Sequence, residues 1–157
     1  MTGSPMPGLA WAKVRGEFAF DGSWRDIFVL GTDLAARQRM LDALRAARYD
    51  LSYRRDGKPA ELPASAEEAF PLEGECDRLL SVRFCGVLAN CHFFRRDEIE
   101  FDIDPRELVG QPQLDGLFGF MRCLADAARR DATLCPENCP EAPIFRVRPG
   151  AAAIEWW

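Results

Sequence analysis

The sequence predicts an α+β fold in which an antiparallel sheet, with a meander around residues 79–104, carries two long helices packed on one face. Two observations predict it. Acidic and apolar residues alternate without a break from Glu98 to Asp104, and a period of two is typical of a strand with one buried face. Residues 111–128 place apolar side chains at the spacings of one broad helical face, which predicts a long amphipathic helix.

The composition is that of one packed domain. A chain of 157 residues with 48% hydrophobic residues and 11 Phe is long enough and apolar enough for one substantial core. No internal repeat or linker divides it. We therefore expect a single domain over residues 1–157, with a loose N-terminal arm at 1–12.

The charge balance restricts the class of partner. Twenty basic against 25 acidic residues give a net charge of −5 without any basic block, so nucleic-acid binding is not expected and a basic protein partner suits the chain better. The first residues lack both a basic start and an apolar run, and no apolar stretch approaches the ~20 residues that span a bilayer. We expect a cytoplasmic protein without a membrane partner.

The first third of the chain predicts a hairpin followed by a helix. Two strand-like runs, Val14–Phe20 and Trp24–Leu30, are joined by an Asp-Gly-Ser turn. A helix with its arginines outside the apolar stripe is expected from about Leu34 to Arg48. Thr32 or Asp33 is its expected N-cap.

The middle of the chain predicts the meander. Asp50–Arg55 forms a short strand, and residues 57–78 form a surface excursion with one short helix capped by Ser65. Residues 79–85 and 87–94 form a tight hairpin. Pairing through a two-residue turn at Cys85-Gly86 gives it one apolar face, made of Leu80, Val82, Phe84, Val87, Ala89, Cys91 and Phe93.

The next turn sets the pairing of the acidic strand. A three-residue loop at 96–98 keeps Phe101 and Ile103 on the apolar face, whereas other loop lengths bury unpaired carboxylates at a cost of several kcal/mol. This register places Asp102 across from His92, Asp104 across from Asn90, and Glu100 across from Phe94. Short strands are expected at 132–135 and 144–148.

The polar face of this meander is the main candidate site. It combines four acids with an amide and the single histidine of the chain: Glu98, Glu100, Asp102, Asp104, Asn90 and His92. The plain interpretation is a solvated face with cross-strand ion pairs. The face can also dock a protein partner. Catalysis is the third interpretation, because a carboxylate beside His92 can orient its imidazole, and two carboxylates can hold a cation.

Two other segments are candidate contacts for a partner. The loop between the last predicted strands is stiff and rich in proline, which favours recognition or a simple connection, and it presents Glu137 and Asn138. The chain ends in Trp156 and Trp157, and aromatic ends are good interface anchors.

The cysteines do not require a cofactor. Cys135 and Cys139 fit the spacing of a zinc knuckle loosely, and whether they bind metal is left open, whereas Cys85 and Cys91 do not fit. Free cysteines are commonly buried and inert. No phosphate loop, dinucleotide fingerprint or nucleophile elbow is present either. We therefore expect no metal and no cofactor.

The segments Phe18–Leu30, Cys91–Leu108 and Pro136–Phe145 together resemble a group of small, stand-alone bacterial α+β proteins. That group is similar in size and build to the immunity proteins of polymorphic-toxin systems. The resemblance implies a cytoplasmic, non-enzymatic protein that masks the active site of a toxin, and it carries over no catalytic residue.

These observations favour a non-catalytic binding protein of the immunity type that neutralises a basic-surfaced toxin domain through acidic and aromatic surface. The alternative is a small enzyme or ligand-binding domain that uses His92 and Asp102. A third possibility is a structural subunit that joins an assembly through its tryptophan tail.

Overall fold

The computed structural model describes residues 8–71, 77–92, 95 and 97–157. Its strands are β1 (Arg25–Leu30), β2 (Asp50–Arg55), β3 (Lys58–Ala60), β4 (Arg78–Phe84), β5 (Val87–Cys91), β6 (Glu98–Ile103), β7 (Ala132–Pro136), β8 (Phe145–Val147) and β9 (Ile154–Trp156). Its helices are α1 (Trp11–Val14), α2 (Leu34–Ala46), α3 (Ala66–Ala69) and α4 (Gln111–Ala128), with 3-10 turns η1 (Arg15–Phe18) and η2 (Pro105–Glu107).

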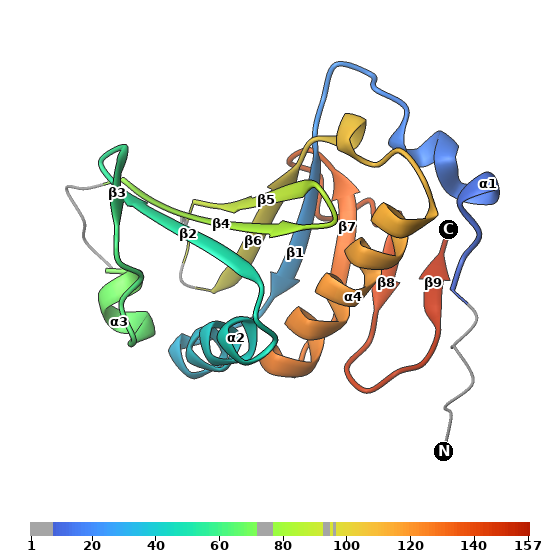
Figure 1. The fold of residues 1–157 in the computed structure, drawn as a ribbon. Coiled ribbons are helices and arrows are strands. Elements are labelled where there is room, and N and C mark those ends of the chain that lie inside the picture. The colour runs from blue at the N-terminus through green and yellow to red at the C-terminus, as the bar shows by residue number, and fades with distance from the viewer. Residues whose placement is uncertain (1–7, 72–76, 93–94, 96) are drawn as a thin grey trace.

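The strands form one antiparallel sheet in the order β3-β2-β4-β5-β6-β1-β7-β8-β9 (Figure 1). The predicted α+β class with an antiparallel sheet is therefore confirmed. Strand β1 lies between β6 and β7, so the first strand of the chain is central in the sheet. The acidic strand β6 consequently has a neighbour on both sides, β5 and β1.

The N-terminal segment departs from the predicted hairpin. Val14–Phe20 is not a strand, because Val14 ends α1 and the next four residues form η1. Both Val14 and Phe18 are buried, and a spacing of four residues places both on one side of a helical turn. Phe18 stacks between Trp11 and Phe145, at ring distances of 5.7 and 6.0 Å. Of the expected arm at 1–12, residues 1–7 lie outside the described part.

The β4–β5 hairpin matches its predicted pairing. Leu80 faces Cys91, Val82 faces Ala89 and Phe84 faces Val87, and the inward residues are buried. Cys85 and Gly86 form the turn with φ angles of 48° and 79°, as a two-residue hairpin loop requires.

The predicted pairing of β5 with β6 is wrong by two residues. Asn90 faces Asp102 and Ala89 faces Ile103, so Asp102 is not across from His92 and Asp104 is not across from Asn90. Glu98 belongs to β6 instead of to the turn. The predicted faces are nevertheless right, because a shift of two residues leaves every side chain on the same side of a strand. Phe93, Phe94 and Arg96 lie outside the described residues.

Helices α2 and α3 begin at their predicted caps. The Asp33 carboxylate caps α2 by accepting a hydrogen bond from Ala36 N at 2.8 Å, and Ser65 Oγ caps α3 by accepting one from Glu68 N. Arg37 is an exception to the predicted α2 surface, since it is buried beside Phe70 and donates to Glu98 O. The hydrogen bond to Glu98 O and the contact with the Phe70 ring offset the free-energy cost of burying this guanidinium.

The core lies between α4 and the sheet. Helix α4 contacts β1, β4, β7 and β8, and α2 contacts α4 and α3 (Figure 1). Phe120 of α4 stacks on Phe84 and meets Phe101 edge-on, both at 5.1 Å. The placement of both long helices on one face stays a prediction.

Two short edge strands were not predicted. Strand β3 lies in the segment predicted as a surface excursion, and it includes Pro59, which a sheet tolerates at an edge. Strand β9 lies in the C-terminal tail and pairs with β8.

Candidate functional site

A row of polar side chains crosses the sheet on the face opposite the aromatic core residues. Ser81, Asn90, Asp102, Asp26 and Cys135 are successive cross-strand partners on β4, β5, β6, β1 and β7. Ser81 Oγ donates to Asn90 Oδ1 at 2.7 Å. The row pairs Asn90 with Asp102, where the sequence predicts Asp104, and it adds Asp26, which the sequence does not predict as a site residue.

The contact between His92 and Asp102 is present in spite of the shifted register. His92 Nε2 lies 3.3 Å from Asp102 Oδ2, and their side chains are 39% and 26% exposed. Protonation of His92 converts this contact into an ion pair. The predicted carboxylate–histidine pair therefore exists at a half-buried position.

Asp26 is the most buried acid of the site, with 1% of its surface exposed. Its Oδ2 accepts a hydrogen bond of 2.7 Å from Asn138 N, which ties the proline-rich loop to the sheet. Among the described residues its Oδ1 has no hydrogen-bond donor, although the atom is buried. Burial raises the pKa of Asp26, while the bond from Asn138 acts in the opposite direction.

Asp26, Glu100 and Asp102 form what we call the carboxylate cluster. Burial, followed by the negative charge of Asp26, raises the pKa of Glu100 to about 7. Burial also raises the pKa of Asp102, against the opposing influence of His92. Asp102 Oδ1 is a second buried oxygen without a hydrogen-bond donor in the described part of the chain. Among the described residues, His92 is thus the one basic side chain that pairs with the cluster, and no arginine or lysine does.

This arrangement can accept protons or a cationic group. A carboxyl with a pKa of about 7 exchanges its proton near neutral pH, and a guanidinium or ammonium brought to the cluster would supply the missing donors. The part of the chain that the structure describes holds no group of three or more His, Cys, Asp or Glu side chains placed to bind a metal ion.

The other predicted acids lie around the cluster or apart from it. Glu98 is half-buried on β6 across from Leu30 of β1. Asp104 lies beyond the strand, where it caps η2 and pairs with Arg106 at 2.9 Å, so its charge is already compensated. The Glu137 carboxylate accepts a bond of 3.4 Å from Trp24 N.

Asn138 has a left-handed backbone, with φ of 60°, which Asn tolerates better than most residues. Because Asn138 N donates to Asp26, the loop bearing Glu137 and Asn138 adjoins the carboxylate cluster. Cys135 is buried and Cys139 is half-buried in the same region.

The two terminal tryptophans do not form one patch. Trp156 pairs with Phe145, whose ring centre is 6.3 Å away, so it lies on the core side of β9. Trp157 lies against the guanidinium of Arg146 at 5.0 Å, and Arg146 belongs to the polar face. Their side chains are 41% and 58% exposed.

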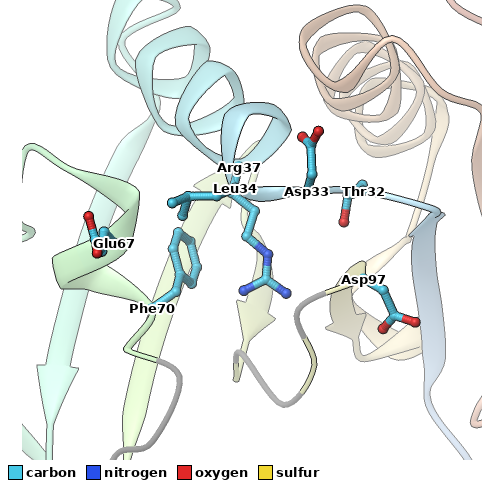
Figure 2. Close-up of a pocket in the computed structure, with 7 residues that line it drawn as sticks. All are labelled: Thr32, Asp33, Leu34, Arg37, Glu67, Phe70 and Asp97. Atoms are coloured by element: carbon cyan, nitrogen blue, oxygen red, sulfur yellow. The ribbon is translucent and has the colours of Figure 1, made fainter.

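A cavity of about 330 Å³ opens at the start of α2, outside the predicted site. Leu34 and Phe70 give it apolar walls, and Figure 2 shows the guanidinium of Arg37 between Phe70 and Asp97. Thr32, Asp33 and Glu67 complete the lining. None of the residues singled out in the sequence analysis as a site lines this cavity.

A second cavity, of about 290 Å³, adjoins the carboxylate–histidine pair. His92 forms part of its lining together with Arg54, Gly57, Asp77, Arg78 and Leu79. A small ligand bound there would lie beside the imidazole. Together with the contact between His92 and Asp102, this cavity favours the predicted alternative of a small ligand-binding or catalytic site.

Comparison of the chain with protein-family models, with curated proteins and with solved structures found no match in any of the three. Among the described residues, no helix is both long enough and apolar enough to cross a membrane.

Proposed function

We propose that this chain is a non-catalytic, cytoplasmic binding protein that receives cationic side chains of a protein partner at the carboxylate cluster. Within that class we propose an immunity protein. Such a protein masks the active site of a toxin domain, and the toxin domain is the partner that has the basic surface. The observation that carries the proposal is the gathering of three half-buried or buried carboxyls, Asp26, Glu100 and Asp102, in which one buried oxygen of Asp26 and one of Asp102 have no hydrogen bond from an arginine or lysine of the described residues.

The energetics of the free protein support a partner. Leaving a buried acceptor without a donor costs about 1–3 kcal/mol, and like charges directly across two strands add to that cost. Asp26 and Asp102 are such a pair. A guanidinium from a partner would satisfy both oxygens and remove the repulsion, so part of the binding free energy would come from relief of this strain.

The surroundings of the cluster suit a protein partner. Exposed Glu137 and half-buried His92 and Glu98 surround the cluster and add polar contacts. The hydrogen bond from Asn138 to Asp26 holds the adjoining loop in one place before binding, which reduces the entropy lost on association. The net charge of −5 favours encounter with a basic surface.

The immunity function predicts that a toxin domain is encoded beside this chain, and the test is binding to that domain. The double variant Glu100→Gln/Asp102→Asn keeps the shape of the side chains and removes their charge. We expect it to weaken binding by at least about tenfold and to reduce the loss of affinity between about 50 mM and about 300 mM NaCl. Calorimetry at both salt concentrations measures this.

Glu61→Gln is the matched control, because Glu61 is an exposed acid that belongs to neither the cluster nor its surroundings. It should leave the affinity unchanged. Equal affinity of the double variant and the native chain would refute the site, and a toxin domain that stays fully active in the presence of the native chain would refute the immunity function.

A second candidate function is a ligand-binding or catalytic site at His92 and Asp102, which the adjoining cavity favours. In that case His92→Ala abolishes ligand binding or turnover, whereas Glu61→Gln does not. A partner complex that forms normally with His92→Ala, together with no small-molecule binding by the native chain, would remove this candidate.

A further inference from the structure

A third cavity lies on the polar face of the sheet, on the side of β1 opposite to the acidic strand β6. It is open to solvent and has a volume of about 550 Å³, which is within the usual range for small-molecule sites. Its lining comes from β1, β7, β8 and the segments that follow α4, β7 and β8: Phe28, Leu30, Arg129, Arg130, Asp131, Thr133, Pro140, Arg146 and Pro149. We call it the arginine cavity.

The strand register builds the floor of the arginine cavity. Phe28, Thr133 and Arg146 are successive cross-strand partners on β1, β7 and β8. Phe28 is buried, whereas Leu30, two residues along the same strand and on the same face, is 47% exposed. The floor is therefore apolar at β1 and becomes cationic at β8.

The side chains of two arginines at the rim have no polar partner among the described residues, although their backbone N–H groups close the end of α4. Arg129 and Arg130 are exposed, and neither side chain makes a hydrogen bond or ion pair with a residue that the structure describes. Arg129 also adopts a left-handed backbone, with φ of 58°, directly after α4. Glycine is the usual residue there, so an arginine at this position has a cost in stability.

The third arginine is held in place. The Arg146 guanidinium pairs with Glu155, lies 3.9 Å from Asp131 Oδ2 and is 5.0 Å from the ring of Trp157. A cation fixed in this way loses little entropy when it binds a ligand. The three guanidiniums still outnumber the two carboxylates beside them, Asp131 and Glu155, so the cavity keeps a net positive charge, carried by Arg129 and Arg130, in a chain whose net charge is −5.

We propose that the arginine cavity binds a small organic anion whose flat apolar body lies over Phe28 and Leu30 and whose phosphate or carboxylate group contacts Arg129, Arg130 and Arg146. The volume restricts the size of the ligand, and the apolar floor restricts the chemistry of its body. The cationic rim restricts its charge. This inference does not depend on the protein partner proposed for the carboxylate cluster.

Arginines near the C-terminal end of a helix also favour its dipole, without any ligand. Arg48 separates the two explanations. It follows α2 with the same left-handed backbone, φ of 58°, is exposed, and does not line the arginine cavity. Replacement of either arginine by glycine relieves the same backbone strain, so a difference between the two variants in ligand binding reports on the cavity.

The experiment is a titration of isotope-labelled protein with three probes, followed by the amide signals of Thr133 and Arg146. Naphthyl phosphate carries the body and the anion, inorganic phosphate carries the anion alone, and naphthol carries the body alone. We expect saturable shifts with naphthyl phosphate and affinities at least about tenfold weaker for the other two.

The double variant Arg129→Gly/Arg130→Gln should weaken binding of naphthyl phosphate by at least about tenfold, whereas Arg48→Gly should leave it unchanged. Any of four results overturns the proposal: no saturable shift, equal affinity for inorganic phosphate (an adventitious ion only), equal affinity for naphthol, or equal affinity of the double variant. Well-dispersed spectra of both variants show that the fold is intact.

Discussion

Asp26 of β1 and Asp102 of β6 face each other directly across two central strands of the sheet. Asp26 is buried and the Asp102 side chain is 26% exposed, so water screens the repulsion between them only in part. The neighbouring Glu100 responds to the same field with a pKa of about 7. The folded protein therefore holds protons that the unfolded chain releases.

The first prediction concerns pH. The pKa of Glu100 rises from its ordinary value of 4.5 to about 7 on folding. The stability it contributes is then fully present below about pH 4.5 and is lost as the pH rises through about 7. We expect the free energy of unfolding to be greater at about pH 5 than at about pH 8, by roughly 1–2 kcal/mol from this group. Urea denaturation at both values measures it.

The control for this prediction is Glu100→Gln, which cannot titrate. It should reduce the difference between the two pH values and leave only the smaller contributions of Asp26 and Asp102. A native protein that is more stable at about pH 8 than at about pH 5 would contradict the assignment.

The second prediction concerns Asp26→Asn. The amide keeps an acceptor for Asn138 N and removes the charge that opposes ionisation of Glu100. We expect a gain in stability of about 1 kcal/mol at about pH 8, a lower pKa of Glu100, and weaker binding of the partner. Denaturation, carboxyl titration by NMR and calorimetry measure the three. A loss of stability at pH 8 would mean that the Asp26 charge is already compensated.

The third prediction concerns Asn138, whose N–H reaches Asp26 from a left-handed backbone. Asn138→Gly keeps the N–H and favours the positive φ, so stability should change by only a few tenths of a kcal/mol. Asn138→Ala keeps the N–H but strains the backbone, so we expect a loss of roughly 1 kcal/mol. Thermal unfolding compares them, and equal melting temperatures would show that the backbone strain is negligible.

The fourth prediction concerns two glycines on α4. A Cβ at Gly116 would lie 3.0 Å from Cys85 Sγ and 3.2 Å from Phe84 Cδ2, whereas a Cβ at Gly119 would have no neighbour within 4 Å. Replacement of either by alanine gains up to about 1 kcal/mol of helix propensity. We expect Gly119→Ala to stabilise the protein and Gly116→Ala to be less stable than it by about 1–3 kcal/mol. Similar stabilities would show that the β4–β5 turn moves away easily.

Local patterns determined what could be predicted of the fold. The alternation in β6 correctly placed Ile99, Phe101 and Ile103 in the core, and the turn at Cys85 fixed the pairing of β4 with β5. The register of β5 with β6 could not be obtained in this way. Registers that differ by two residues bury the same side chains, so hydrophobicity does not distinguish them.

The pairing of β6 with β1 could not be predicted from local sequence patterns. Strand β1 was predicted to pair with Val14–Phe20, and nothing in either segment indicates a partner far along the chain. That error concealed Asp26 as a member of the site. Its signal was a single acid within the apolar run of β1, a position where a carboxylate requires an explanation.

The central position of β1 also has a consequence for synthesis. Asp26 and the loop residue that binds it, Asn138, are 112 positions apart in the chain. At ribosomal rates of about 5–20 residues per second, β1 waits roughly 5–20 seconds before β7 exists. Its Ile27, Phe28 and Val29, all buried in the finished sheet, lack the cover of β7 for that time. The nascent chain therefore offers a chaperone an apolar strand early in translation, and closure of the sheet is one of the last events of folding.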